Sequence, residues 1–171
     1  LDFDAIEKVY AAGLKVHAIC HPHNPLGRIF SREELTRIAD LAKQYGVTVI
    51  SDEIHAPLTF PGKEFLPFLA VSQHAAEVGI CVTSASKAFN IAGLKSALIV
   101  SQTKEQHELL ATMPISVHFR SSILGAFAAV EAFNKCDDWL DGALVTIESN
   151  AHYLKTLLDT QIPAAKYKIP E

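Results

Sequence analysis

The sequence has no excess of positive charge and no long hydrophobic run. Its 171 residues include 15 lysines and arginines against 19 aspartates and glutamates, a net charge of -4. A weakly acidic chain without a basic stripe argues against nucleic acid as a partner. No apolar run approaches the ~20 residues of a transmembrane helix, so we expect no membrane partner. No signal peptide is visible, and we expect a cytoplasmic protein.

Cysteine is also scarce, and histidine is scattered. Cys20, Cys81 and Cys136 are far apart and odd in number, and two of them lie inside apolar runs. We therefore expect free thiols in a reducing compartment rather than disulfides or a metal site. None of the eight histidines forms a helical metal-binding pair with an acidic partner. The sequence argues against a zinc enzyme.

The hydrophobic pattern predicts an α/β fold. Segments with the periodicity of amphipathic helices alternate with short apolar runs along the chain, and one of these segments begins with a capping box at Ser31 and Glu34. The predicted strands are 16–20, 47–50, 78–83 and 96–100. The predicted helices are 2–12, 31–46, 68–78, 104–112, 121–134 and 137–159, and residues 56–67 form a loop. This order predicts a three-layer α/β/α arrangement around a mostly parallel, covered sheet. We expect the apolar stripe of 121–134 to be part of the core.

Lys87 lies in a small-residue loop between two of these predicted core strands. Desolvation penalises an unpaired charge, so a long cationic side chain is unusual in such a place. One interpretation is an ordinary surface lysine. The other is a lysine that forms a Schiff base with a carbonyl cofactor, helped by the hydroxyls of Ser84 and Ser86.

Polar residues follow three predicted strands at equivalent points. Asn24 follows the first, Asp52 and His55 the second, and the segment 84–87 the third. Taken singly, Asn24 fits an ordinary turn residue and Asp52 an ordinary cap or ion-pair partner. Ligands of parallel sheets bind where strands end and loops begin, so together these residues predict a binding site.

Three motifs in this order resemble a known enzyme family. They are Asn24-Pro25-Leu26-Gly27, Ser51-Asp52-Glu53-Ile54 and Ser84-Ala85-Ser86-Lys87. They are similar to the large domain of fold-type I pyridoxal-phosphate enzymes, the class I/II aminotransferases and their relatives. The longer strings 21–28, 51–55 and 87–94 resemble the cystathionine β-lyase subgroup, C-S lyases of the MalY/PatB type.

The resemblance implies pyridoxal 5'-phosphate as cofactor, with Lys87 as the catalytic residue that forms the Schiff base and moves the α-proton. Asp52 would pair with the pyridine nitrogen, and Asn24 would donate to the phenolic oxygen. The implied cofactor-binding set is Asn24, Asp52, His55, Ser84, Ser86, Lys87 and Lys95.

Two positions depart from the aminotransferase pattern. Lys95 would contact the phosphate together with Ser84, but many relatives have arginine there, which binds phosphate through a bidentate fork. Without the resemblance, Lys95 is equally well explained as an exposed residue at a strand edge. His55 stands where aminotransferases usually have tyrosine, and this favours the lyase subgroup.

The resemblance implies β-elimination of cysteine thioethers, such as cystathionine, to a thiol, pyruvate and ammonia. An aminotransferase of the same fold and a non-catalytic α/β module are the alternatives. The partners would be a small amino-acid substrate and, in the full-length protein, a second copy in a homodimer.

Family members are longer than this chain. We expect residues 1–136 to be part of the cofactor-binding large domain and 137–171 a long helix leading toward a small domain. A fragment of this kind would have weak or no activity alone. We expect Arg28 or Arg120 near the site, but neither matches the family's carboxylate-binding arginine.

Overall fold

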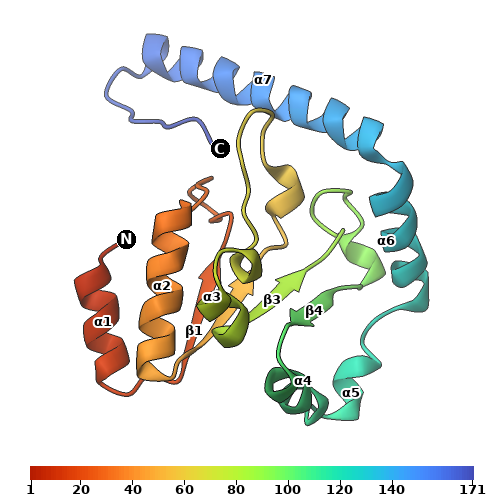
Figure 1. The fold of residues 1–171 in the computed structure, drawn as a ribbon. Helices are drawn as coiled ribbons and strands as arrows, with labels where there is room; N and C mark the ends of the chain where they lie inside the picture. The colour runs from red at the N-terminus through yellow and green to blue at the C-terminus, as the bar shows by residue number, and fades with distance from the viewer.

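The computed structural model describes residues 1–171 and has an α/β fold (Figure 1). The four strands are β1 (Val16–Cys20), β2 (Thr48–Asp52), β3 (Gly79–Thr83) and β4 (Leu98–Ser101). The α-helices are α1 (Phe3–Ala11), α2 (Arg32–Tyr45), α3 (Gln73–Val78), α4 (Lys104–Ala111), α5 (Ile115–His118), α6 (Ile123–Lys135) and α7 (Asp137–Gln161). Short 3-10 turns are η1 (Ala56–Leu58), η2 (Phe68–Ala70) and η3 (Ala92–Leu94).

The sheet is mostly parallel, as predicted. Its strand order is β1-β2-β3-β4, with β1, β2 and β3 parallel and β4 antiparallel to β3. Cys20 is in register with Asp52, and Asp52 with Val82. The carboxyl ends of the three parallel strands therefore meet at one edge of the sheet, which brings the loops that follow them together.

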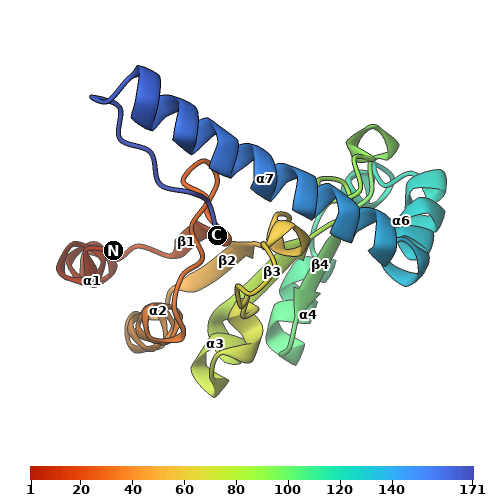
Figure 2. The same cartoon turned by 90° about the horizontal axis from the view of Figure 1, so that it is seen from above.

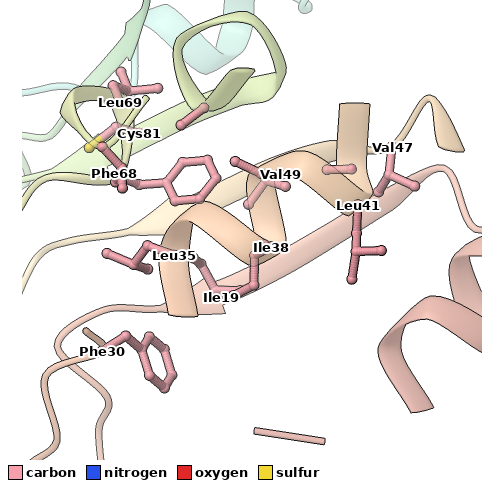
Figure 3. Close-up of a cluster of buried hydrophobic side chains, with 14 of the residues drawn as sticks. Ile19, Phe30, Leu35, Ile38, Leu41, Val47, Val49, Phe68, Leu69 and Cys81 are labelled. Atoms are coloured by element: carbon pink, nitrogen blue, oxygen red, sulfur yellow. The ribbon is translucent and has the colours of Figure 1, made fainter. Parts of the chain in front are cut away.

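The main core lies between the sheet and the helices α1, α2 and α3 (Figure 3). Leu35, Ile38 and Leu41 on α2 are almost fully buried and pack in one cluster with Val49 of β2 and Phe68. Local sequence explains why α2 forms there. The capping box of Ser31 and Glu34 is present, and Gly46 ends the helix in the left-handed conformation with φ 67°.

Helices lie on both sides of the sheet. Figure 2 shows α1, α2 and α3 on one side and the long α7 on the other. Helix α7 passes over the carboxyl end of the sheet, above the loops that follow the parallel strands (Figure 1). None of the helices is both long and apolar enough to cross a lipid bilayer.

The structure corrects the expectation that β4 and α6 are buried. Leu98 of β4 is 57% exposed, and Ile123 and Phe127 of α6 are 70% and 64% exposed. Their local pattern is apolar, but β4 is an edge strand, and among the described residues nothing covers this side of α6. Burial depends on such tertiary neighbours, which sequence periodicity does not report.

Two helical segments also differ from the prediction. The predicted helix 68–78 is divided into η2 and α3, because the Ser72 side chain accepts from the Ala75 amide and begins a new helix. Helix α5 was not predicted. Helix α7 extends to Gln161, and the tail after it returns to the loop that follows β1. Helix α7 begins at the predicted domain limit, but the division into 1–136 and 137–171 remains a prediction.

Candidate active site

Three loops at the carboxyl edge of the sheet form the candidate site. They follow β1, β2 and β3 and carry the sequence-predicted residues (Figure 1). Parallel pairing of the strands brings Asn24, Asp52 and Ser84 to the same edge, as the sequence predicts. Lys87 and Lys95 lie on the third loop, between β3 and β4.

Asn24 lies at the tip of a short hairpin after β1. The amide of His23 donates to the Arg28 carbonyl at 2.7 Å, and the amide of Gly27 donates to the His23 carbonyl at 2.8 Å. Gly27 has φ 58°, and a Cβ there would lie 2.6 Å from the Cβ of Pro170. Only glycine therefore fits this turn against the returning tail. The hairpin fixes the backbone of Asn24 and leaves its side chain exposed.

The Asn24 side chain contacts His55, which is 31 residues away. Asn24 Nδ2 lies 3.3 Å from His55 Nε2. Both residues line a cavity of about 230 Å³ that is also bordered by Phe60, by Ile147 of α7 and by Pro170 of the tail. This contact joins the loops that follow β1 and β2.

Asp52 is the last residue of β2 and is half-buried. Its Oδ1 accepts a hydrogen bond from the backbone amide of Ile54 at 3.2 Å. No lysine, arginine or histidine in the structure forms a salt bridge with it. A half-buried carboxylate without a cationic partner is suited to a positively charged ligand group.

Glu53 supports the second loop, a role that the motif 51–54 does not by itself reveal. Its side chain is 3% exposed, and its Oε1 accepts hydrogen bonds from Ser51 Oγ at 2.9 Å and from the Phe68 amide at 2.8 Å. The only signal for this role in the sequence is that an acidic residue directly follows an apolar strand. Glu53 thereby holds the two ends of the 53–68 segment together next to Asp52.

His21 is a second supporting residue that the sequence did not reveal. Its ring is fully buried and stacks on Phe30. Nδ1 accepts from the Phe30 amide at 3.3 Å, so Nε2 carries the proton and donates to the Leu66 carbonyl at 3.1 Å. Burial lowers the pKa of His21 below its usual value. A neutral imidazole therefore joins the first loop to the second.

Ser84 and Ser86 form a local hydrogen-bond network at the start of the third loop. Ser84 is 3% exposed, and its Oγ lies 2.6 Å from the Ser96 carbonyl oxygen and 2.8 Å from Ser86 Oγ. It also accepts from the Ser86 amide at 3.0 Å. A carbonyl can only accept, so the single hydroxyl proton of Ser84 is used there. Ser86 is half-buried, and its hydroxyl is the donor in the contact with Ser84 Oγ.

Lys87 is exposed, which corrects the expectation of a desolvated lysine. The backbone on either side is anchored, because Ala85, Ala88 and Phe89 are buried in a small cluster with Ala132 of α6. The small neighbours that surround the lysine along the chain are too short to cover its side chain. The structure therefore fixes the position of the Lys87 backbone and leaves its amine accessible.

Lys95 is exposed and is held through its backbone by α6. The Ser122 amide donates to the Lys95 carbonyl at 2.8 Å. Lys95 itself has φ 56°, an uncommon conformation for a residue other than glycine. A Cβ at Gly125 of α6 would collide with the carbonyl of Leu94. This close contact sets the position of the third loop.

The charged groups of this edge fit the ligand that the sequence resemblance implies. Neither Lys87 nor Lys95 forms a salt bridge, and Asp52 also has none. Pyridoxal phosphate has a carbonyl, a phosphate and a basic ring nitrogen. These groups match, respectively, the amine of Lys87, the cation of Lys95 with the serine hydroxyls of the third loop, and the carboxylate of Asp52. The residues present therefore fit the cofactor.

The two arginines expected near the site do not contribute to it. Arg28 forms an ion pair with Glu34, and its guanidinium lies 5.2 Å from the ring centroid of Phe30. Arg120 is exposed and follows α5, the helix that Figure 1 shows at the end of the molecule away from α7. The substrate-carboxylate ligand is therefore not one of these two side chains in the arrangement described.

The cysteines are all free thiols, as predicted. Cys81 is buried in the core, and burial together with the nearby Glu53 raises its pKa, so it is a poor nucleophile. No group of three or more histidine, cysteine, aspartate or glutamate side chains is placed to hold a metal ion.

Comparisons with known proteins identify a family model and sequence relatives that match this chain. The family model described as aminotransferase class I and II matches residues 1–169. Cystathionine β-lyase PatB of Bacillus subtilis is 35% identical over 178 residues, covering 100% of this chain and 45% of the relative. The chain therefore spans less than half of the length of this relative.

Two solved structures have the same fold over this chain. The pyridoxal-phosphate-bound C-S lyase from Staphylococcus hominis superposes with a TM-score of 0.89 at 33% identity, covering 100% of this chain and 43% of that one. Cystalysin from Treponema denticola, which contains pyridoxal 5'-phosphate, has a TM-score of 0.89 at 31% identity, with 100% and 44% covered.

Proposed function

Because the chain belongs to the aminotransferase class I and II family, we propose that it is part of a pyridoxal-phosphate-dependent C-S β-lyase. The reaction converts a cysteine thioether, such as cystathionine, and one water into a thiol, pyruvate and ammonia. One observation carries the proposal: the loops after β1, β2 and β3 bring Asn24, Asp52 and the Lys87 segment to one edge of the sheet. The C-S lyases with the same fold support it.

In this proposal the three loops bind different parts of the cofactor. The Asp52 carboxylate faces the ring nitrogen, and the Asn24 amide donates to the phenolic oxygen. Lys95 binds the phosphate through its ammonium group, and Ser86 binds it by turning its hydroxyl proton from Ser84 Oγ to a phosphate oxygen. Ser84, whose own proton is used by the Ser96 carbonyl, accepts from the Ser86 amide and fixes the start of the loop. When bound, pyridoxal phosphate supplies a ring that withdraws electrons from the substrate α-carbon.

The amine of Lys87 acts as the general base of the reaction. Its Nζ takes the proton from the α-carbon of the substrate, and the electron pair left behind expels the thiolate from the β-carbon. The negative charge of Asp52 stabilises positive charge at the ring nitrogen throughout. The exposed amine has the freedom that this proton transfer requires, and its anchored backbone keeps it over the same edge.

A lyase is favoured over an aminotransferase by the residue at position 55. An aminotransferase usually has tyrosine there, and this chain has His55 in contact with Asn24. The relatives named as lyases are 35% and 33% identical to this chain over its whole length, compared with 28% for a solved structure with an aminotransferase name that covers it equally. We therefore take elimination, rather than amino-group transfer, as the outcome.

Product analysis tests the reaction. Full-length protein is incubated with pyridoxal phosphate and cystathionine, and pyruvate, ammonia and free thiol are measured over time. We expect equal amounts of the three products with the wild-type protein and none of them with Lys87→Ala. A new amino acid formed from an added keto acid, without free thiol, would show that the protein is an aminotransferase.

We further propose that the full-length protein is a cytoplasmic homodimer. Three free cysteines suit a reducing compartment. Large exposed apolar residues on α6, such as Ile123, Leu124 and Phe127, provide surface that a second chain can cover. Sedimentation equilibrium of the full-length protein measures the assembly directly, and a monomer at all concentrations would contradict the dimer.

A further inference from the structure

The Asn24 amide can present either its nitrogen end or its oxygen end to the cofactor, whose place beside it rests on the proposed function. The hairpin after β1 fixes the backbone of Asn24 but not the rotation of its amide, because the oxygen and nitrogen ends are nearly equal in size. Only the nitrogen end can donate to a phenolic oxygen. A partner that distinguishes donor from acceptor must therefore set the orientation.

His55 is the side chain that contacts this amide. Asn24 Nδ2, which can only donate, lies 3.3 Å from His55 Nε2. The contact is a hydrogen bond only if Nε2 is unprotonated, so the ring is neutral and carries its proton on Nδ1. The second N–H of the amide is then free for another acceptor at the same edge of the sheet.

Protonation of His55 would reverse this arrangement. An imidazolium donates from both nitrogens, so Nε2 would attract Asn24 Oδ1 in place of Nδ2. The amide would rotate, and its second N–H would no longer be directed at the cofactor. The phenolic oxygen would then face the amide oxygen of Asn24, which repels it, instead of an N–H donor.

We infer that His55 is a positioning residue whose neutral Nδ1–H tautomer orients the Asn24 amide, so that Asn24 donates to the cofactor's phenolic oxygen only while His55 is uncharged. His55 acts through Asn24 and does not itself bind the cofactor. The affinity for the cofactor then depends on pH through His55, a residue that forms no bond to the cofactor.

Other ionisable groups around this ring do not substitute for it. The titratable groups that line the shared cavity with His55 are His23 and Glu171, and Asp52 and Glu53 lie three and two residues before His55 along the chain. Helix α7 contributes only the apolar Ile147 to the cavity. The carboxylate of Glu171 accepts from the Ile29 amide and is paired with Lys168, so it is already satisfied. None of these groups forms a hydrogen bond with the Asn24 amide, whose side-chain partner is His55.

A double-mutant cycle in the full-length protein tests the inference. The dissociation constant of pyridoxal phosphate is measured by absorbance titration from about pH 8 to about pH 5.5. We expect His55→Phe to weaken binding about fivefold to tenfold at the upper pH, the effect of one hydrogen bond. In an Asn24→Ala background the same substitution should have no further effect.

The conservative variant His55→Gln separates positioning from packing. Glutamine can accept from Asn24 Nδ2 but does not titrate, so we expect near wild-type affinity and a flatter pH profile. His23→Gln is the matched control, because it removes a histidine from the same cavity without touching the amide contact, and it should keep the wild-type profile. Titration of the cofactor phosphate is common to all variants and cancels in the comparison.

The ring tautomer supplies a readout that needs no cofactor. In protein labelled with ¹⁵N-histidine, we expect the His55 signals at neutral pH to show a protonated Nδ1 and an unprotonated Nε2. A protonated Nε2, or equal effects of His55→Phe with and without Asn24, overturns the inference alone. A wild-type protein that binds no pyridoxal phosphate overturns the proposed function and this inference with it.

Discussion

The buried imidazole of His21 donates from Nε2 to the carbonyl oxygen of Leu66, 45 residues away, at 3.1 Å. Its Nδ1 accepts from the Phe30 amide, so both ring nitrogens are used and the ring is neutral. This histidine fixes the loop after β1 against the loop after β2. Because one loop carries Asn24 and the other begins directly after Asp52, His21 supports the arrangement of the candidate site.

Stability should therefore decrease in mild acid. Burial lowers the pKa of His21, with the Leu66 hydrogen bond and nearby carboxylates opposing it in part, and burial also lowers the pKa of His17. The unfolded chain then binds protons more readily than the folded protein. The free energy of unfolding falls as the pH drops below about 6.5, until the buried rings themselves titrate.

Urea unfolding at several pH values, with wild type and His21→Gln, measures this effect. The variant should be less stable at neutral pH by about 1–3 kcal/mol, because a buried amide or carbonyl loses its partner. It should also show a smaller pH dependence than wild type. An unchanged slope would mean that His21 does not cause the acid sensitivity.

Glu53 should contribute stability through its acceptor oxygen. Glu53→Ala leaves the buried Ser51 hydroxyl and the Phe68 amide without a partner, and we expect a loss of about 2–4 kcal/mol in the free energy of unfolding. Glu53→Gln keeps one acceptor oxygen and should lose less. Equal losses in both variants would show that the negative charge, and not the acceptor, matters.

Ser84 and Ser86 should separate stability from cofactor binding. Ser84→Ala removes a buried hydroxyl that bonds the Ser96 carbonyl, so the free energy of unfolding should fall by about 1–3 kcal/mol. Ser86→Ala should change stability little but weaken pyridoxal phosphate binding about tenfold, since a hydrogen bond to a charged phosphate is lost. Thermal unfolding and absorbance titration measure the two effects. The reverse pattern would contradict the assigned roles.

Asp52 should matter for its charge rather than its shape. Asp52→Asn keeps an oxygen that can accept from the Ile54 amide, so we expect an unchanged melting temperature. Cofactor affinity and the rate of pyruvate formation should each fall at least about tenfold, because a charge-assisted hydrogen bond is lost. Wild-type affinity in this variant would remove Asp52 from the cofactor site.

The sequence predicts the fold where local signals are sufficient. The capping box at Ser31 and the strand ends that carry Asn24 and Asp52 are encoded in adjacent residues, and the structure agrees with them. Contacts over long separations were not predictable. The Asn24–His55 pair and the His21–Leu66 bond each depend on how two loops meet.

The same limit explains the incorrect predictions of burial. An apolar run such as β4 looks like a core strand, but its exposure is decided by the neighbours that pack against it. The position of the Lys87 loop between two strands predicts a desolvated side chain, but the structure shows this side chain exposed. Sequence pattern reports which residues are apolar, and the tertiary arrangement decides which of them are covered.

The central claim is that Lys87 binds pyridoxal phosphate. Absorbance spectra are recorded after adding the cofactor to wild-type protein and to Lys87→Ala, followed by borohydride reduction and peptide mapping. We predict a visible band in wild type only, with the reduced cofactor attached to the peptide that contains Lys87. A band of equal intensity in Lys87→Ala, or attachment at another lysine such as Lys95, would contradict the claim.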